Sequence, residues 1–207
     1  MQRSSISSVS NQILRRARAH GRGSVFTPAD FLDLGSRTAV DQALSRLTKA
    51  GRLRRLVRGL YDYPQVHSQL GPLAPAPDAV AKALARETGS SLQVAGAQAA
   101  NALGLSTQVP ARSVYLTDGP SRRVVLGKRV VHIRHASPKH LVAAGSMAGT
   151  VVQALRHLGP DSVSAVVSAA AQHLTASDRR ALAKRANQAP AWMRPALNRI
   201  AGQSSSG

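Results

Sequence analysis

Apolar residues recur at helical spacing near the start of the chain and predict two short helices. The first is predicted over residues 10–20, where apolar side chains return every three or four positions. The second begins after Thr27, because Pro28 is tolerated at the first helical position and Asp30 stands three residues beyond the cap. Gly35 ends this second helix and leaves only a tight turn before the next element.

The strongest pattern covers residues 36–63 and predicts a third helix followed by a basic hairpin. One apolar stripe defines the helix, and it consists of Val40, Ala43, Leu44 and Leu47. Ser36 supplies a capping oxygen at its start, and Gly51 ends it. The runs 53–56 and 60–63 are short enough to be strands joined by residues 57–59. Three helices with a tight turn and a terminal hairpin indicate a winged helix-turn-helix over residues 1–64.

The rest of the chain predicts a second domain of mixed class. The stretch 64–77 contains four prolines and no charged residue, and residues 65–77 are interpreted as a linker. A domain over residues 78–201 follows, and residues 202–207 are expected to be a disordered tail. Its predicted elements are helices at 78–88 and 94–103, strands at 113–117, 124–126 and 130–133, and helices at 145–157, 163–174, 176–187 and 192–200. The expected class is α+β and mostly helical, with a small β-sheet or hairpin and a C-terminal helical bundle.

The large positive net charge of the chain limits the kinds of molecule that it is expected to bind. The 207 residues contain 28 Lys and Arg against 9 Asp and Glu, a formal net charge of +19, while aromatic residues make up only 3%. An excess of this size indicates a polyanionic partner, most often nucleic acid, with an anionic membrane as the rival. A genome rich in arginine codons is the neutral explanation, because Arg far outnumbers Lys.

The sequence offers little for catalysis, metals or secretion. There is no cysteine, no paired carboxylates, no nucleophile elbow and no phosphate-binding glycine loop, so no enzyme activity and no cofactor are expected. His132, His135 and His140 are close in sequence but lack a zinc-binding spacing, so no metal site is expected. The start has no secretory apolar core and no uncharged run is long enough for a membrane span, which favours the cytoplasm without membrane attachment.

The winged-helix interpretation assigns DNA contacts to individual residues. Residues near the start of the third helix are expected to read base edges: Ser36, Arg37, Thr38 and Gln42. Residues further along the helix and in the hairpin are expected to contact phosphates: Ser45, Arg46, Lys49, Arg52, Arg54, Arg55 and Arg58. Asp41 lies on the same face and could hold Arg37 in place. A second basic surface, either solvated or used for nucleic acid or an acidic partner, consists of Arg122, Arg123, Lys128 and Arg129.

Two sequence blocks carry a resemblance to a known family. The run LTKAGRLRRLVRGLY at 47–61 resembles the N-terminal winged helix of AbiEi-type antitoxins, the regulator halves of type IV toxin–antitoxin systems. The blocks ANALGLSTQVPAR at 100–112 and VYLTDGPSRR at 114–123 resemble the second domain of a compact branch of that group. The resemblance implies a bacterial, nucleoid-associated repressor that binds inverted repeats in its own promoter. It also implies opposition to a toxin with a nucleotidyltransferase fold, usually without a stable complex.

Two other functions stay open beside a DNA-binding repressor. One is a basic interaction module that neutralises an acidic protein, such as the toxin itself. The other is an RNA-binding protein, which the few aromatic residues disfavour because single-stranded bases are usually held by stacking.

Overall fold

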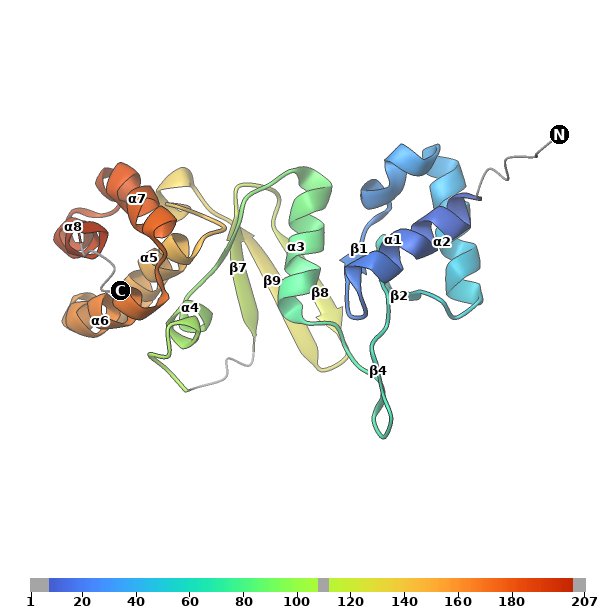
Figure 1. Cartoon of the computed structure of the whole chain (residues 1–207), viewed down its shortest axis with the longest axis horizontal. Helices are drawn as coiled ribbons and strands as arrows, with labels where there is room; N and C mark the ends of the chain where they lie inside the picture. Colours follow the sequence, from blue (N-terminus) through green and yellow to red (C-terminus); the bar gives the residue numbers. More distant parts are fainter. Residues whose placement is uncertain (1–7, 108–111, 203–207) are drawn as a thin grey trace. The chain divides into compact units, whose positions relative to one another are not determined.

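The computed structural model describes residues 8–107 and 112–202 (Figure 1). The chain divides into two compact units between Thr88 and Gly89. The α+β class is confirmed, with most of the ordered chain in helices and a helical C-terminal region. No helix among the described residues has both the length and the apolar character that crossing a membrane requires.

The N-terminal unit has the three helices and the hairpin that the sequence predicts, together with three further short strands and a fourth helix. Its elements are α1 (Val9–His20), β1 (Val25–Phe26), η1 (Pro28–Leu34), α2 (Arg37–Lys49), β2 (Arg54–Val57), β3 (Leu60–Asp62), β4 (Val66–His67), β5 (Gly71–Pro72) and α3 (Pro77–Thr88). Two details differ from the prediction. Helix α1 begins at Val9, one residue earlier than predicted, and Ser8 caps it by accepting from the Asn11 amide at 3.3 Å. The second helix is a 3-10 helix, held at its start by the Thr27 amide, which donates to the Asp30 carboxylate at 2.8 Å.

The core of the N-terminal unit lies between α1, η1 and α2. The apolar stripe predicted for α2 is buried, as are Ile13 and Ala17 of α1 and Phe31 of η1. Strands β1, β3 and β2 form an antiparallel sheet in that order, so β3 is central and β2 is an edge strand. Residues 65–77 were predicted to be a linker, but they contain a small antiparallel hairpin in which β4 pairs with β5.

Helix α3 belongs to the N-terminal unit, which corrects the predicted domain boundary. Arg86 of α3 donates from Nε to the Asp30 carboxylate at 3.1 Å and from a terminal nitrogen to the Val25 carbonyl at 3.0 Å. Asp30 in turn caps η1 through Thr27, so one carboxylate fastens two helices to the unit. The boundary at Thr88 therefore lies beyond the predicted linker at 65–77, and α3 is not the first helix of the second domain.

The C-terminal unit joins a four-stranded sheet to a group of helices. Its elements are β6 (Leu92–Val94), α4 (Ala97–Ala102), β7 (Ser113–Thr117), β8 (Arg122–Leu126), β9 (Arg129–His135), η2 (Pro138–His140), α5 (Met147–Leu158), η3 (Pro160–Ser162), α6 (Val163–His173), α7 (Ala176–Arg185), η4 (Ala186–Gln188), η5 (Ala191–Met193) and α8 (Arg194–Gly202). A helix was predicted over residues 94–103. The structure instead has strand β6 up to Val94, followed by the shorter helix α4. The predicted tail at 203–207 lies outside the described residues.

The sheet of this unit has the order β6-β7-β9-β8. Strand β7 pairs parallel with β9, whereas β6 and β8 pair antiparallel with their neighbours. Tyr115 of β7 and Ile133 of β9 face each other in register and are both buried, which marks the covered face of the sheet. Because side chains alternate along a strand, Val114, Leu116, His132 and Arg134 lie on the opposite face.

Helices α5 to α8 gather into the largest core of the protein, with α5 at its centre (Figure 1). Ser146 caps α5 by accepting from the Gly149 amide at 3.2 Å. The buried Gln93 of β6 anchors this helix to the sheet, since its amide donates to Thr150 at 3.2 Å and accepts from the Gly145 amide at 3.0 Å. Gly149 is required at this contact because an added Cβ would lie 2.4 Å from the Ala143 carbonyl oxygen.

Candidate nucleic-acid interface

Helix α2 presents a polar face to solvent opposite its buried stripe. Ser36 caps the helix by accepting from the Ala39 amide at 3.3 Å, so its hydroxyl has a structural task in addition to its predicted role at DNA. All predicted contact residues of the helix are exposed: Ser36, Arg37, Thr38, Gln42, Ser45, Arg46 and Lys49. The structure therefore brings the predicted helix residues onto one accessible surface.

The angular positions of these residues around α2 place some at the centre of its exposed face and others on the two sides of that face. At about 100° per residue, Thr38, Gln42, Ser45 and Lys49 point almost directly away from the buried stripe. Arg37 lies on one flank with Asp41, and Arg46 lies on the other. The central stripe is the part that would enter a groove most deeply, which gives Thr38 and Gln42 the best placement for base edges.

Arg37 is held by an ion pair within the same helix. Its Nε donates to the Asp41 carboxylate at 3.0 Å, and the two side chains are 62% and 49% exposed. An exposed pair of this spacing contributes well under about 1 kcal/mol to stability. Its main effect is to limit the conformations that Arg37 samples at the edge of the polar face.

The basic hairpin that follows the helix is formed by β2, β3 and the turn between them. Gly59 adopts a φ of +76° at the turn, a conformation that favours glycine. Arg55 and Arg58 are exposed on the hairpin, and Arg52 is exposed in the loop before it. Three exposed guanidinium groups therefore follow Lys49 in the chain within nine residues.

Arg54 does not share this exposure, which corrects its assignment as a phosphate contact. Its Nε donates to Asp62 at 3.0 Å, a terminal nitrogen makes a second bond to the same carboxylate, and that nitrogen also donates to the Leu73 carbonyl at 2.7 Å. The Asp62 side chain is only 1% exposed. Arg54 therefore neutralises a buried carboxylate directly across the hairpin, and its guanidinium is occupied within the protein.

Helix α1 adds exposed cations that the sequence interpretation did not assign. Arg15 and Arg18 are exposed, whereas Arg16 makes two hydrogen bonds to the Asp33 carboxylate at 2.8 and 2.6 Å. The hydrogen bonds from Arg16 lower the pKa of Asp33 below its ordinary value. The signal that separates these arginines is the helical period, because Arg15 and Arg18 lie away from the stripe formed by Ile13 and Ala17.

The second basic surface predicted on the C-terminal unit is divided between two faces. All four residues, Arg122, Arg123, Lys128 and Arg129, are exposed in or beside the β8–β9 hairpin. Arg122 is in register with the buried Ile133, while Arg123 is in register with His132 on the other face. The four cations surround an edge hairpin and do not form a single patch.

The histidines of this unit have separate surroundings. His132 and His135 lie on opposite faces of β9, as the strand period predicts. His135 Nδ1 lies 3.0 Å from the Gly119 carbonyl oxygen. Burial, with the nearby cations Arg156 and Lys139, lowers the pKa of His140 below its ordinary value. Within residues 8–107 and 112–202, no three His, Asp or Glu side chains gather in a way that could hold a metal ion.

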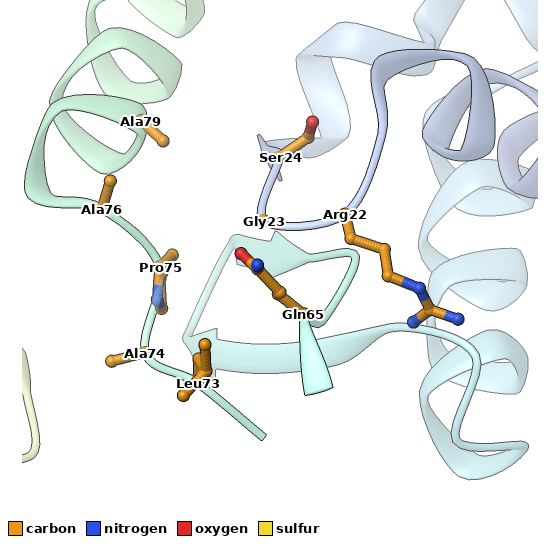
Figure 2. A pocket seen from close by; sticks show the side chains of 9 residues that line it. All are labelled: Arg22, Gly23, Ser24, Gln65, Leu73, Ala74, Pro75, Ala76 and Ala79. Carbon is orange, nitrogen blue, oxygen red and sulfur yellow. The ribbon is translucent and has the colours of Figure 1, made fainter. Parts of the chain in front are cut away.

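A cavity of about 330 Å³ lies in the N-terminal unit beside residues 73–76 (Figure 2). Its wall is formed largely by the small apolar side chains of this segment, and the Gln65 amide points into the space. Arg22 turns its guanidinium away from that wall, where it donates to the Pro64 carbonyl at 2.9 Å and lies over the Tyr63 ring. No carboxylate, histidine or cation is directed into the cavity from its lining, so this cavity offers no acid–base pair.

Comparison with known proteins gives three results. No curated protein matches the chain at a significant level. The crystal structure of the RV2827C protein from Mycobacterium tuberculosis is similar over 94% of this chain and 78% of that chain, with 18% sequence identity and a TM-score of 0.43. A family model, described as a family of unknown function, matches residues 12–182. This match covers most of both units, and the chain therefore belongs to the DUF6088 family.

Proposed function

We propose that the protein is a sequence-specific DNA-binding repressor whose N-terminal unit acts as a winged helix-turn-helix. The supporting observation is the exposed polar face of α2 together with the exposed arginines that follow it in the chain, Arg52, Arg55 and Arg58. A helix of 13 residues with this face fits the major groove, which is about 12 Å wide. The hairpin arginines then contact the backbone on one side of the groove.

The contacts in this proposal separate into two kinds. Thr38 and Gln42 on the central stripe read base edges, and glutamine prefers adenine because it can make two hydrogen bonds to its major-groove edge. Arg37 on the flank prefers guanine and is restricted by Asp41. Phosphate contacts come from Ser45, Arg46, Lys49, Arg52, Arg55 and Arg58.

The resemblance to AbiEi-type antitoxins supplies the proposed biological setting. In that setting the protein is bacterial and nucleoid-associated, binds inverted repeats in its own promoter and represses the operon. Its functional counterpart is a toxin with a nucleotidyltransferase fold, which it opposes without a stable complex. The protein is not an enzyme in this proposal, and it needs no cofactor.

The experiment compares four probes at two salt concentrations. Fluorescence anisotropy measures binding to a duplex from upstream of the protein's own gene, a shuffled duplex, one of the single strands and a structured RNA. We expect the upstream duplex to bind most tightly, with all affinities falling steeply as salt rises. Equal binding to both duplexes would refute sequence specificity, and preferential binding to the single strand or the RNA would refute the groove-reading role of α2.

Replacement of Gln42 by alanine tests the readout itself. We expect the variant to lose about 1–3 kcal/mol of discrimination at one base pair while its affinity for the shuffled duplex stays unchanged. Lys49→Ala is the matched comparison, because loss of a phosphate contact weakens binding to all duplexes alike. If both variants weakened all duplexes to the same extent, α2 would contact only the backbone.

A further inference from the structure

A second cavity, also of about 330 Å³, lies in the C-terminal unit on the open face of the sheet. It is lined by residues 95–97 together with Gln98, Arg112, Val114, Leu116 and Arg134. Its rim is tied to β7, because the Val114 amide donates to the Gln98 side chain at 3.0 Å and the Val114 carbonyl accepts from the Ala95 amide at 3.2 Å. This size is at the lower end of ordinary ligand pockets.

Strand geometry places an arginine at each end of this cavity with an aliphatic floor between them. Val114 and Leu116 of β7 are two residues apart and share one face of the sheet, and Arg112, which directly precedes β7, lines the same cavity. Leu116 pairs in register with Arg134 on the neighbouring strand β9. Arg112 stands four residues before the position that pairs with Arg134, a separation of roughly 13 Å along an extended chain, and Val114 and Leu116 lie between them in the sequence.

Both arginines are exposed and have no counterion on this face. Neither guanidinium makes a hydrogen bond or an ion pair with another residue of the described ranges 8–107 and 112–202. Residues 89–207 contain fourteen Lys and Arg but only three acids, all of them aspartates. Asp118 accepts from the Ser91 amide, Asp178 caps α7 and Asp161 lies in η3, so none of the three lines the cavity. The field at this face is positive and uncompensated.

The lining also distinguishes among anionic partners. Single-stranded nucleic acid is usually held by aromatic stacking, and no aromatic side chain lines this cavity, since Tyr115 of β7 is buried on the other face. A free inorganic anion would leave the floor of Val114 and Leu116 uncovered. A ligand that joins carboxylates to an aliphatic side chain would satisfy both parts of the surface.

We propose that this cavity binds an extended acidic segment of a partner protein. In an extended chain, residues at positions 1, 3 and 5 share one face and span about 13 Å, which equals the offset between the two arginines. A segment with acids at positions 1 and 5 and an aliphatic residue at position 3 places its carboxylates on Arg112 and Arg134 and its apolar side chain over Val114 and Leu116. The inference does not depend on DNA binding by the N-terminal unit.

The test uses the full chain and a synthetic peptide, acetyl-Ser-Glu-Ser-Leu-Ser-Glu-Ser-amide. Two-dimensional NMR follows the methyl groups of Val114 and Leu116 during titration. We expect saturable shifts of these methyl groups, and we expect Arg112→Gln and Arg134→Gln each to weaken binding at least about 5-fold through loss of a charge-assisted bond. Arg180→Gln, an exposed arginine of α7 that is absent from the lining, is the matched control and should leave the affinity unchanged.

Three comparisons can overturn the proposal. The first peptide has glutamine in place of both glutamates, and equal binding would show that charge is not recognised. The second has its two glutamates adjacent, and equal binding would exclude the spacing of the arginines as the determinant. Tighter binding of inorganic phosphate or of oligothymidylate at the same methyl groups would assign the cavity to phosphate groups. Absence of saturable shifts with the parent peptide also refutes the proposal.

Discussion

Replacing Arg55 and Arg58 together by alanine removes two exposed cations of the basic hairpin without disturbing the buried pair beside them. Both side chains are exposed, so the variant is expected to fold as the parent does. If each cation neutralises one phosphate, binding to every duplex should weaken to a similar degree. Sequence preference should be retained, because phosphate contacts carry no direct sequence information.

The size of this effect follows from counterion release. Five cations remain as phosphate contacts after the exclusion of Arg54, and they are Arg46, Lys49, Arg52, Arg55 and Arg58. They predict a slope of about −4.5 for log K against log salt, and the double variant should reduce this to about −2.7. At about 0.15 M salt, each lost contact costs roughly 5-fold, so the two together cost roughly 30-fold, or about 2 kcal/mol.

The measurement is a set of binding isotherms at four or more salt concentrations, with the upstream and the shuffled duplex. Arg180→Ala with Arg185→Ala is the matched control, because it removes the same charge from exposed positions of α7. A parental slope in the hairpin variant would refute the phosphate assignment. Equal losses in both double variants would show that net charge, and not the hairpin, sets the affinity.

Three further predictions concern stability. Arg54→Ala leaves the buried Asp62 carboxylate without its cation and should lower the free energy of unfolding by about 3 kcal/mol, whereas Arg55→Ala should change it by less than about 0.5 kcal/mol; similar urea midpoints would contradict the buried pair. Gly149→Ala forces a Cβ against the Ala143 carbonyl oxygen, which cannot move aside as a side chain could, and should cost about 1–3 kcal/mol in thermal unfolding; an unchanged Tm would show that α5 has room there. The pKa of His140 is lowered in the folded state, so the unfolded chain binds more protons there below its pKa of about 6.5. The free energy of unfolding that depends on neutral His140 is therefore complete above that pH and is lost as the pH falls through and below it. His140→Gln should therefore flatten the decline of Tm between about pH 7 and pH 5, and parallel curves would reject this cause.

Features set by neighbouring residues were predictable from the sequence. The buried stripe of α2 and its Ser36 cap follow from helical spacing and local hydrogen-bonding chemistry, and both are present. The outward direction of Gln42 follows from the same period. Strand boundaries were less accurate, because β6 has only three residues and exists through its pairing with β7, about twenty residues further along the chain.

Contacts between distant residues could not be predicted in the same way. Arg54 and Arg55 are adjacent in a basic run, and only the pairing of β2 with β3 decides that Arg54 meets Asp62. The pair of Arg86 with Asp30 joins residues 56 positions apart. The cavity between Arg112 and Arg134 requires the parallel pairing of β7 with β9, which no local pattern specifies.

The attachment of α3 through Arg86 has a consequence for dissecting the protein. A fragment that stops within residues 65–77 loses the cation that bridges Asp30 and the Val25 carbonyl. Limited proteolysis should accordingly release a resistant N-terminal piece that retains residues up to Thr88. A fragment intended to fold as this unit should therefore include α3 and end at Thr88.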